Sequence, residues 1–558
     1  MNLNNALVLN NLTFTYPGKN TPVLKDINLK IERGSFTAIM GSNGSGKTTL
    51  CKLFNGIIPH FFSGDLEGEV LVDGLNTLDQ DVGSLSELVG YVHQDFKNSI
   101  VRSKVFDEVC YAPLNYGYDD YQERAEKSLE ILGIQHLKEE YIWQLSGGQQ
   151  HLVALACVVA MEPEYIVVDE PVAQLDPHHA HALYGVLNTL NKEYNKTIIV
   201  IEHHAEFVAN YCTDVVLLNE GNLVWMKPVQ AALTDYDTLL SCQIYPPQVT
   251  QLMKRLNTKS ELPITLNQAY TQLNGVIQKE VLSTPSRVYD KQTLSLHNIT
   301  SGYQNMERIV VPVIKNISLT CYENERIAIV GNNGSGKSTL LKVIARLNRI
   351  IEGSLSLNGH VYTDQPSEIT ANQIGVILQN PEEMFIEDSV HGDISYFLRA
   401  RKYEGIEEYV NHIIKTLNLV PFKNSDPRLL SGGQQRRVSL GIGMGMRPEI
   451  LLLDEPTSSL DINSRQELIK LLDSLKETIK TVIIATHDMQ LVADWATRVI
   501  VLNQGNIIFD GTPFDLFQNQ QILEQSNLII PEIIKLGKKL SLKGHYLSVD
   551  DVSRALGG

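Results

Sequence analysis

The sequence predicts an α/β fold that is built twice along one chain, with a phosphate-binding loop in each half. A glycine-rich loop, Gly41 to Thr48, follows an apolar strand-like run and precedes a helix-like segment. The same pattern, G-x-x-x-x-G-K-[ST], recurs as Gly331 to Ser338. Further motifs recur at a constant offset, which indicates a repeat of whole domains.

The residues of these loops suit the binding of a nucleotide. Glycines let the backbone wrap the phosphates, and amides at a helix N-terminus face the anion. Lys47 supplies a point charge, and the Thr48 hydroxyl can ligate magnesium. The predicted nucleotide-binding residues are Gly41, Asn43, Gly44, Gly46, Lys47, Thr48 and Thr49, then Gly331, Asn333, Gly334, Gly336, Lys337, Ser338 and Thr339. A single match arises by chance in roughly one chain in fifty of this length, but two matches in the same context do not.

Length and composition narrow the class of protein. At 558 residues the chain is too long for one core and fits two large duplicated halves. A net charge of −17 disfavours a broad nucleic-acid surface. The six cysteines lack C-x-x-C spacing, which predicts reduced thiols in a cytosolic setting. No signal peptide is expected, and the longest apolar run, Leu152 to Met161, is about half a membrane span. We therefore expect a soluble chain that reaches a membrane only through partner subunits.

A tyrosine precedes each loop by a similar distance. Tyr16 and Tyr303 could each stack on an adenine base, or each could be an ordinary strand tyrosine.

Three further motifs keep the same spacing in both halves. Adding 285 to Gln94, Ser146 and Asp169 gives Gln379, Ser431 and Asp454. Each glutamine ends a strand-like run. Each serine opens Leu-Ser-Gly-Gly-Gln at a helix start, where a hydroxyl and exposed amides can meet an anion, so Ser146, Gly148, Ser431 and Gly433 form a second predicted phosphate-binding surface.

Two buried strands end in paired carboxylates. Asp169 and Glu170 end one, and Asp454 and Glu455 end the other. The aspartates suit a magnesium shell, and the glutamates suit polarisation of the attacking water. His203 and His487 end later strands and could touch the γ-phosphate, although a histidine at a strand end is usually structural.

These motifs together resemble the ATP-binding-cassette (ABC) family over nearly the whole chain. They correspond to Walker A, Q-loop, LSGGQ signature, Walker B with its glutamate, D-loop and switch histidine. The resemblance implies ATP and Mg²⁺ as cofactors, with phosphoryl transfer to water as the reaction. The implied magnesium residues are Thr48, Gln94, Asp169, Ser338, Gln379 and Asp454, and the implied catalytic residues are Glu170, Glu455, His203, His487, Gln94 and Gln379.

In that family two cassettes pack head to tail, so one cassette's signature closes on nucleotide held by the other. The resemblance therefore implies that the two cassettes of this chain pair with each other. Ser431 and Gly433 would complete the site of Lys47, and Ser146 and Gly148 would complete the site of Lys337.

The loop after Gln379, Asn380 to Phe385, looks like that of energy-coupling-factor (ECF) and cobalt-type importers. There a proline and acidic residues meet a transmembrane coupling protein. The first half, Asp95 to Ser99, lacks the proline. The implied partners are a coupling protein and a small substrate-binding membrane protein, with the chain peripheral at the cytoplasmic face of the membrane.

A repeated tail follows each cassette, with Thr265 and Ser548 as expected helix N-caps. Such tails occur in ECF-type ATPases, where they support cassette pairing; the alternative is a mere linker. The expected domains are a first cassette over 1–233, its extension and linker over 234–292, a second cassette over 293–515 and an extension over 516–558.

The first half departs from the family pattern at two places. His151 stands opposite Arg436 after the signature, and Ala173 to Asp176 replaces Ser458 to Asp461 in the D-loop. Both departures are expected to face the site of Lys337, which predicts that this site hydrolyses ATP more weakly.

His178 to His181 is interpreted as a solvated helix start rather than a metal site. Three glycines between Gly441 and Met446 predict close packing of a neighbouring element.

Three functions fit the motifs. The leading one is the ATPase of an ECF-type vitamin or metal importer. A tandem ATPase of a sugar importer also fuses two cassettes, but the loop after Gln379 and the paired tails argue against it. A translation-associated twin-cassette protein is disfavoured by the acidic charge and by a proline-bearing connection, Thr234 to Thr293.

Overall fold

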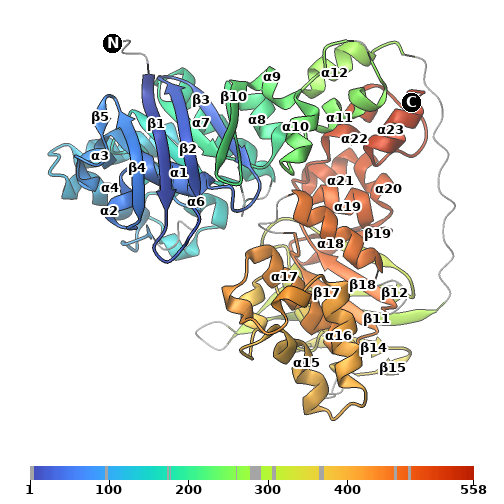
Figure 1. Cartoon of the computed structure of the whole chain (residues 1–558). Helices are drawn as coiled ribbons and strands as arrows, with labels where there is room; N and C mark the ends of the chain where they lie inside the picture. The colour runs from blue at the N-terminus through green and yellow to red at the C-terminus, as the bar shows by residue number, and fades with distance from the viewer. Residues whose placement is uncertain are drawn as a thin grey trace. The chain divides into compact units, whose positions relative to one another are not determined.

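The computed structural model describes residues 5–94, 99–172, 175, 177–258, 260–276, 291–304, 309–362, 370–457, 462–474 and 479–557. The chain divides into two compact units, Met1–Gly275 and Val276–Gly558 (Figure 1). Each unit is an α/β domain, which confirms the predicted fold class. The tail after the first cassette belongs to the first unit, whereas the finer domain boundaries stay predictions.

A mainly parallel sheet forms the centre of the first unit. Its strand order is β10-β9-β3-β8-β7-β6, and only β10 is antiparallel to its neighbour. The central strands are buried along their whole length, which is typical of a parallel sheet covered on both faces. The strands are β3 (Phe36–Gly41), β6 (Val89–Val92), β7 (Tyr165–Asp169), β8 (Thr197–Ile201), β9 (Asp214–Asn219) and β10 (Asn222–Pro228).

An antiparallel sheet with strand order β2-β1-β4-β5 packs beside it. Its buried side chains form one core with α1 and with one face of the central sheet, and the second core lies on the opposite face under the helices. The strands are β1 (Asn5–Thr15), β2 (Leu24–Glu32), β4 (Asp65–Val72) and β5 (Leu75–Asn76). The helices are α1 (Lys47–Phe54), α2 (Ile57–His60), α3 (Val82–Leu88), α4 (Val105–Asn115), α5 (Tyr121–Ile131), α6 (Gly147–Val159), α7 (Pro177–Lys192), α8 (Ala205–Tyr211), α9 (Val229–Leu233), α10 (Tyr236–Ser241), α11 (Gln248–Arg255) and α12 (Leu266–Leu273).

The second unit repeats this architecture, with sheets β16-β17-β18-β13-β19-β20 and β12-β11-β14-β15. Its strands are β11 (Gln292–Gln304), β12 (Val310–Tyr322), β13 (Arg326–Val330), β14 (Glu352–Leu357), β15 (His360–Val361), β16 (Ile374–Ile377), β17 (Ile450–Asp454), β18 (Thr481–Ala485), β19 (Arg498–Asn503) and β20 (Asn506–Gly511). Its helices are α13 (Lys337–Ile344), α15 (Val390–Ala400), α16 (Ile406–Thr416), α17 (Gly432–Gly445), α18 (Ile462–Ser474), α19 (Met489–Trp495), α20 (Pro513–Gln518), α21 (Gln520–Gln525), α22 (Glu532–Lys539) and α23 (Val549–Ala555).

The tail helices begin where the sequence predicts. The Thr265 hydroxyl accepts a hydrogen bond from the Gln268 amide, and the Ser548 hydroxyl accepts one from the Asp551 amide. In both cases the third helical residue bonds back to the cap, which completes a capping box. The predicted N-caps are confirmed, and the role of the tails in pairing stays a prediction. Among the helices that the structure describes, none combines the length and apolar character that a membrane crossing requires.

The glycines of α17 confirm the predicted close packing. A Cβ atom added at Gly441 would lie 2.7 Å from Ile394 Cδ1, and one at Gly445 would lie 2.4 Å from the Ile394 carbonyl oxygen. Both contacts come from α15, so α15 and α17 approach closely only because these positions carry no side chain.

We expect Gly445→Ala to lower the free energy of unfolding by about 1–3 kcal/mol, because the backbone at Ile394 must move. Gly185→Ala in α7 is the matched control, since a Cβ there meets no atom within 4 Å; it is expected to stabilise by up to about 1 kcal/mol. Urea unfolding measures both changes. A Gly445→Ala protein as stable as the unchanged chain would contradict the packing explanation.

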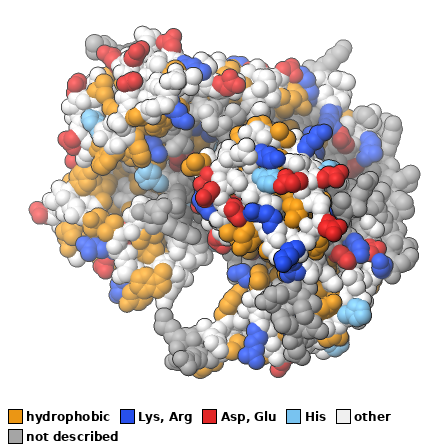
Figure 2. Space-filling view, turned by 60° about the horizontal axis from the view of Figure 1, so that its bottom comes forward, with side chains coloured by type: hydrophobic (Ala, Val, Ile, Leu, Met, Phe, Trp, Pro, Cys, Tyr) orange, Lys and Arg blue, Asp and Glu red, His pale blue; other side chains and the backbone are white. Residues whose placement is uncertain are grey.

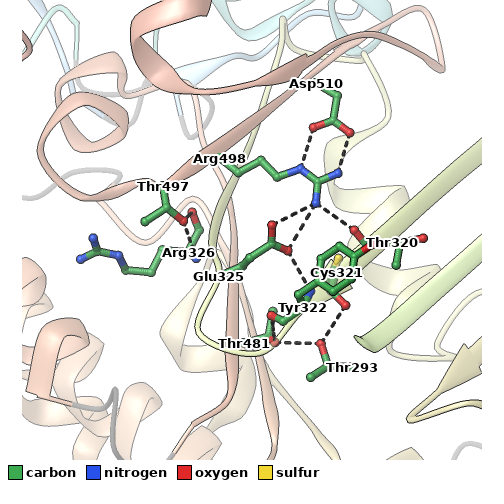
Figure 3. A network of polar contacts seen from close by, with 10 residues as sticks. All are labelled: Thr293, Thr320, Cys321, Tyr322, Glu325, Arg326, Thr481, Thr497, Arg498 and Asp510. Carbon is green, nitrogen blue, oxygen red and sulfur yellow. Dashed lines mark hydrogen bonds and ion pairs between the residues drawn. The ribbon is translucent and has the colours of Figure 1, made fainter. Parts of the chain in front are cut away.

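A partly buried charge network is specific to the second unit (Figure 3). Arg498 on β19 donates to both oxygens of Asp510 at 2.6 and 2.7 Å, to Glu325 at 3.1 Å and to the Thr320 carbonyl at 2.8 Å. By strand register, Ser35 and Asp214 occupy the places of Glu325 and Arg498 in the first unit. The two units therefore share a fold but differ in how β19 or β9 is fastened to the sheet.

Candidate nucleotide-binding and catalytic sites

In the first unit the phosphate loop runs from the end of β3 into α1, as the sequence predicts. Lys47 is 6% exposed, and its Nζ donates to the carbonyl oxygens of Gly41 and Ser42 at 2.8 and 2.9 Å. Gly46 has φ 100° at the N-cap of α1. A Cβ at Gly41 would lie 2.4 Å from the Leu218 carbonyl oxygen. The glycines are therefore required by backbone conformation and close approach, and the lysine is already folded over the loop.

The second unit reproduces this loop between β13 and α13. Lys337 Nζ donates to the carbonyl oxygens of Gly331 and Asn332 at 2.7 and 3.1 Å, and Gly336 has φ 105°. The two tyrosines lie at the same place relative to each loop. Tyr16 Oη lies 3.1 Å from Thr49 Oγ1, and Tyr303 Oη lies 3.3 Å from Thr339 Oγ1. Both rings are next to the first turn of a loop helix, and stacking on adenine stays a prediction.

The predicted magnesium aspartates lie at the carboxyl ends of β7 and β17, beside the loop hydroxyls. Ser338 Oγ donates to Asp454 Oδ1 at 3.1 Å. Burial raises the pKa of Asp169, and hydrogen bonds from Tyr91 and Thr48 offset part of this effect. Burial likewise raises the pKa of Asp454 against the Ser338 hydrogen bond. A buried carboxylate beside a hydroxyl is a donor set that suits a hard cation such as Mg²⁺.

Glu170 lies among the residues that the sequence assigned to catalysis in the first unit. Gln94 Nε2 donates to Glu170 Oε2 at 2.5 Å, and His203 Nε2 lies 3.2 Å from Glu170 Oε1. Burial alone raises the pKa of Glu170, but His203, with Lys47 and His204 nearby, brings the pKa of this carboxyl below its ordinary value. The structure thus brings Gln94, Glu170 and His203 into one hydrogen-bonded group.

Glu455 makes different contacts in the second unit. Its Oε2 accepts a hydrogen bond from the His487 amide at 3.3 Å and lies 3.0 Å from His487 Nδ1. Its Oε1 lies 4.0 Å from Lys337 Nζ. The Glu455 side chain is 8% exposed, against 20% for Glu170. Burial lowers the pKa of His487, but Glu455 and Asp488 outweigh burial and raise it above its ordinary value.

Both glutamates have left-handed backbone, with φ 49° at Glu170 and φ 45° at Glu455. This conformation is costly for a residue with a side chain, and such strain gathers at functional sites. Each glutamate stands between an aspartate and a proline, so the same strained turn aims both side chains.

The two signature motifs form helix N-termini. Ser146 and Ser431 cap α6 and α17, each in a capping box with the glutamine three residues later. Both serines are exposed. A Cβ at Gly148 would lie 2.8 Å from the His179 ring, so this glycine is needed for the packing of α6 against the start of α7. The predicted helix starts are confirmed, and phosphate binding by these amides stays a prediction.

His151, which was expected to face the site of Lys337, is instead buried within its own unit, and so is Arg436 at the equivalent position. Arg436 is 5% exposed and donates to the carbonyl oxygens of Leu378 and Gln379 at 2.9 and 2.7 Å. Burial lowers the pKa of Arg436 to about 10. His151 is 3% exposed, and burial lowers its pKa to about 4. The second residue after each signature is thus turned inward, and Arg436 supports the Q-loop of its own unit. Most of both D-loops, and Asp95 to Asn98, lie outside the described residues.

A buried carboxylate orders the segment after each Q-loop. Asp393 Oδ1 accepts the amides of Ile386 and Glu387, both at 2.8 Å. Glu108 Oε2 accepts the amides of Val101 and Arg102 at 3.0 and 2.5 Å. Val101 and Ile386, at equivalent positions, are each 60% exposed. Each unit therefore holds an apolar side chain out from a fixed loop.

Some contacts at these sites could not be expected from motif spacing. Tyr91 donates to Asp169 Oδ2 at 3.0 Å, and the second unit has Val376 at its place. From the sequence, a tyrosine inside an apolar strand does not indicate that its hydroxyl will reach the aspartate of a neighbouring strand. Glu202, directly before His203, is a charged residue after a fully buried strand, and that position was a usable signal.

Fold, phosphate loops and strand-end carboxylates together define a pair of nucleotide-binding P-loop domains. The family model described as ABC transporter matches residues 24–173 and 314–458, so the chain belongs to the ABC transporter ATP-binding family and its two domains are ATP-binding cassettes.

Relatives of similar length share this organisation. A protein of Methanosarcina acetivorans that carries the provisional name ABC transporter ATP-binding protein is 30% identical, over 98% of this chain and 89% of its own length. One of Methanosarcina mazei with the same provisional name is 31% identical, over 96% of this chain and 93% of its own length. A solved structure, cbiO1 from Clostridium perfringens, described as part of the ABC transporter complex cbiONQ, is 32% identical over 45% of this chain and 99% of its own, with a TM-score of 0.39.

Proposed function

We propose that this chain is the ATP-hydrolysing subunit of an ECF-type importer for a vitamin or a metal ion, docked on the cytoplasmic face of the membrane. ATP binding would close the two cassettes on each other and hydrolysis would reopen them, because the nucleotide prefers one state. Transmembrane partners would convert that motion into transport.

The roles of the site residues follow from their chemistry. Lys47 and Lys337 would bind the phosphates in place of their present loop carbonyls. Mg²⁺, when bound, neutralises the phosphate charge. In the first unit Thr48, Asp169 and Gln94 would hold it. In the second unit Ser338, Asp454 and Gln379 would hold it. Glu170 and Glu455 would orient the attacking water, and His203 and His487 would hold these carboxylates in place. The exposed N-termini of α6 and α17 suit an anion, which supports the proposal that each signature completes the site of the other cassette.

The loop after Gln379 is the observation that carries the importer proposal. Asn380 caps a short helical turn, Pro381–Met384, and both Glu382 and Glu383 are exposed on it. Ile386 is exposed directly after the turn, while Asp393 fixes the backbone there. Arg428 adds a hydrogen bond to the Phe385 carbonyl at 3.2 Å. A rigid loop that presents two carboxylates and an isoleucine suits a partner with basic and apolar side chains.

The charge distribution agrees with a protein partner rather than nucleic acid. Acidic and basic side chains are interspersed on the face shown in Figure 2, with hydrophobic side chains between them. Together with the net charge of −17, this argues against a phosphate backbone as ligand.

Capture from membranes tests the importer proposal. A tagged Glu170→Gln/Glu455→Gln chain, expected to stay closed on ATP, is used to pull down partners from gently solubilised membranes, followed by mass spectrometry. We expect a polytopic coupling protein and a small substrate-binding membrane protein. Recovery of ribosomes without any membrane protein would contradict the importer and favour a role in translation.

We expect the charge reversal Glu382→Lys/Glu383→Lys to lower recovery of the coupling protein about tenfold or more, since like charges would face each other in the complex. ATP hydrolysis by the isolated chain should not change. The control is Glu404→Lys/Glu408→Lys, which reverses two exposed carboxylates of the same unit away from this loop. Equal recovery with both double variants would remove this loop from the docking surface.

A further inference from the structure

Two buried polar side chains of the first unit lie directly behind the histidine that contacts Glu170. Glu202 follows β8 and is 2% exposed, and Tyr184 on α7 is 0% exposed. Neither is among the residues assigned to nucleotide, magnesium or water. A carboxylate is buried only where hydrogen bonds satisfy it, so its partners indicate what it holds in place.

Glu202 holds the backbone of the switch-histidine loop. Its Oε1 accepts the amides of His203 and His204, both at 2.8 Å, and its Oε2 accepts the Tyr184 hydroxyl at 2.6 Å. The Glu202 amide donates to the Ile39 carbonyl at 3.2 Å, on the strand that leads into the phosphate loop. The Glu202 carboxylate therefore links α7 to the histidine loop, and the Glu202 backbone joins this loop to β3.

Tyr184 is itself fixed by an aromatic cluster. Its ring stacks on Phe207 with centroids 4.7 Å apart, lies 5.1 Å from Tyr211 and lies 6.3 Å from Phe36. Phe207 and Tyr211 belong to α8, which begins two residues after His203. The hydroxyl that meets Glu202 therefore comes from a ring packed on the very helix that follows the histidine loop.

The second unit lacks this support. Thr486 stands where the first unit has Glu202, and Ile469 stands where it has Tyr184. The Thr486 hydroxyl accepts the Asp488 amide at 3.0 Å, the counterpart of the His204 amide. The His487 amide donates to Glu455 instead, at 3.3 Å. In the first unit Glu202 takes that amide, and the oxygens of Glu170 meet Gln94 and the His203 ring.

We propose that Glu202, held by Tyr184, is a positioning residue for hydrolysis at the site of Glu170. By accepting the His203 amide, it directs the His203 ring to Glu170 and keeps the backbone amide away from that carboxylate. Glu170 is then oriented by two side chains, whereas Glu455 is drawn toward its own histidine amide and toward Lys337. This inference rests on the proposed ATP hydrolysis and is independent of which transporter the chain serves.

Steady-state ATP hydrolysis by the full chain tests the proposal, in a Glu455→Gln background so that turnover reports the site of Glu170. We expect Glu202→Thr, which installs the residue of the second unit, to lower kcat about 10- to 100-fold by misplacing the His203 ring. The KM for ATP should change less than about threefold, since Glu202 contacts no predicted nucleotide-binding side chain. Glu202→Gln keeps an acceptor oxygen for both amides and should recover most of the rate.

Two further variants separate positioning from packing. Tyr184→Phe keeps the aromatic cluster and removes only the hydroxyl, and an intermediate kcat is expected. Thr486→Val removes the matched acceptor of the second unit and should leave turnover at the Glu170 site unchanged. Thermal unfolding and binding of a fluorescent ATP analogue are measured for each variant, so that a loss of fold is seen separately from a loss of kcat.

The kinetic results of these variants either support or overturn the positioning role of Glu202. A kcat loss in Glu202→Thr that Glu202→Gln restores, with nucleotide binding retained, supports the positioning role. Equal kcat in Glu202→Thr and the parent overturns it, and so does a Glu202→Gln protein as slow as Glu202→Thr. If the otherwise unchanged chain did not hydrolyse ATP, both the proposed function and this inference would be contradicted. If the unchanged chain hydrolysed ATP and the Glu202 variants did so at the same rate, only the inference would be contradicted.

Discussion

Replacement of Glu170 by glutamine is expected to lower the ATP hydrolysis rate of the full chain about 100- to 1000-fold, the lower part of the range of about 100- to 10,000-fold that general acid–base catalysis contributes. Replacement of Glu455 is expected to cost only about two- to fivefold. Glu170 is partly exposed and is oriented by Gln94 and His203, 2.5 and 3.2 Å away. Glu455 is more buried and must leave the His487 amide, 3.3 Å away, before it can orient a water.

Phosphate release under steady-state and single-turnover conditions measures the two effects. Glutamine keeps the volume of the side chain and should leave ATP binding intact, which a fluorescent analogue checks in each variant. Lys47→Ala and Lys337→Ala serve as the matched pair for nucleotide binding, because the two lysines make the same loop contacts in both units. If Glu455→Gln abolished turnover while Glu170→Gln spared it, the assignment of the weaker site to Lys337 would be wrong.

Local features of the fold were predictable from the sequence because their chemistry is local. A phosphate loop needs glycines at fixed positions, and Lys47 and Lys337 follow from the same eight residues. The capping boxes at Ser146 and Thr265 depend on a residue three positions later. The internal repeat then placed Asp169, Glu170 and their counterparts at the ends of equivalent strands.

What the sequence did not predict depends on packing between distant elements. His151 was expected to face the site of Lys337, but it is 3% exposed. Arg436, at the equivalent position of α17, is also turned inward, where it donates to the carbonyl groups of Leu378 and Gln379. The spacing of apolar residues alone does not say which face of α17 meets the core, because glycines and apolar residues occur on several faces of this helix. The Tyr184 hydroxyl likewise reaches Glu202 only through the aromatic stacking of α7 on α8.

The same reasoning explains why the two sites differ although their motifs match. Motif residues occupy equivalent positions in both units, whereas the side chains behind them, Glu202 and Thr486, or Tyr184 and Ile469, are chemically different. An orientation difference at Glu170 and Glu455 therefore arises although the predicted nucleotide-binding residues match, apart from Thr48 and Ser338, which both carry a hydroxyl. Unequal hydrolysis at the two sites was expected from the signature and D-loop departures and stays a prediction. The different contacts of the two glutamates would be a physical cause for it.

The largest stability effect is expected at Arg498. Glu325 is 3% exposed, and in Arg498→Met its carboxylate loses its cationic partner. Among the contacts drawn in Figure 3, the carboxylate then keeps only the hydrogen bond from the Tyr322 amide, at 2.8 Å. Removing one member of a buried ion pair costs about 3–5 kcal/mol because the other charge stays desolvated. For a unit of this size the melting temperature should fall by roughly 6–20 °C.

Differential scanning calorimetry of the full chain measures this change, with the first unit as an internal reference because it lacks the network. The double variant Glu325→Gln/Arg498→Met removes the stranded charge and should recover most of the loss, since the penalty comes from an unpaired carboxylate rather than from a missing bond. The bond from Arg498 to Asp510 contributes less, because Asp510 is 38% exposed and water screens the pair. A double variant as unstable as Arg498→Met would show instead that the lost contacts to Asp510 and Thr320, not the charge of Glu325, set the stability of this sheet.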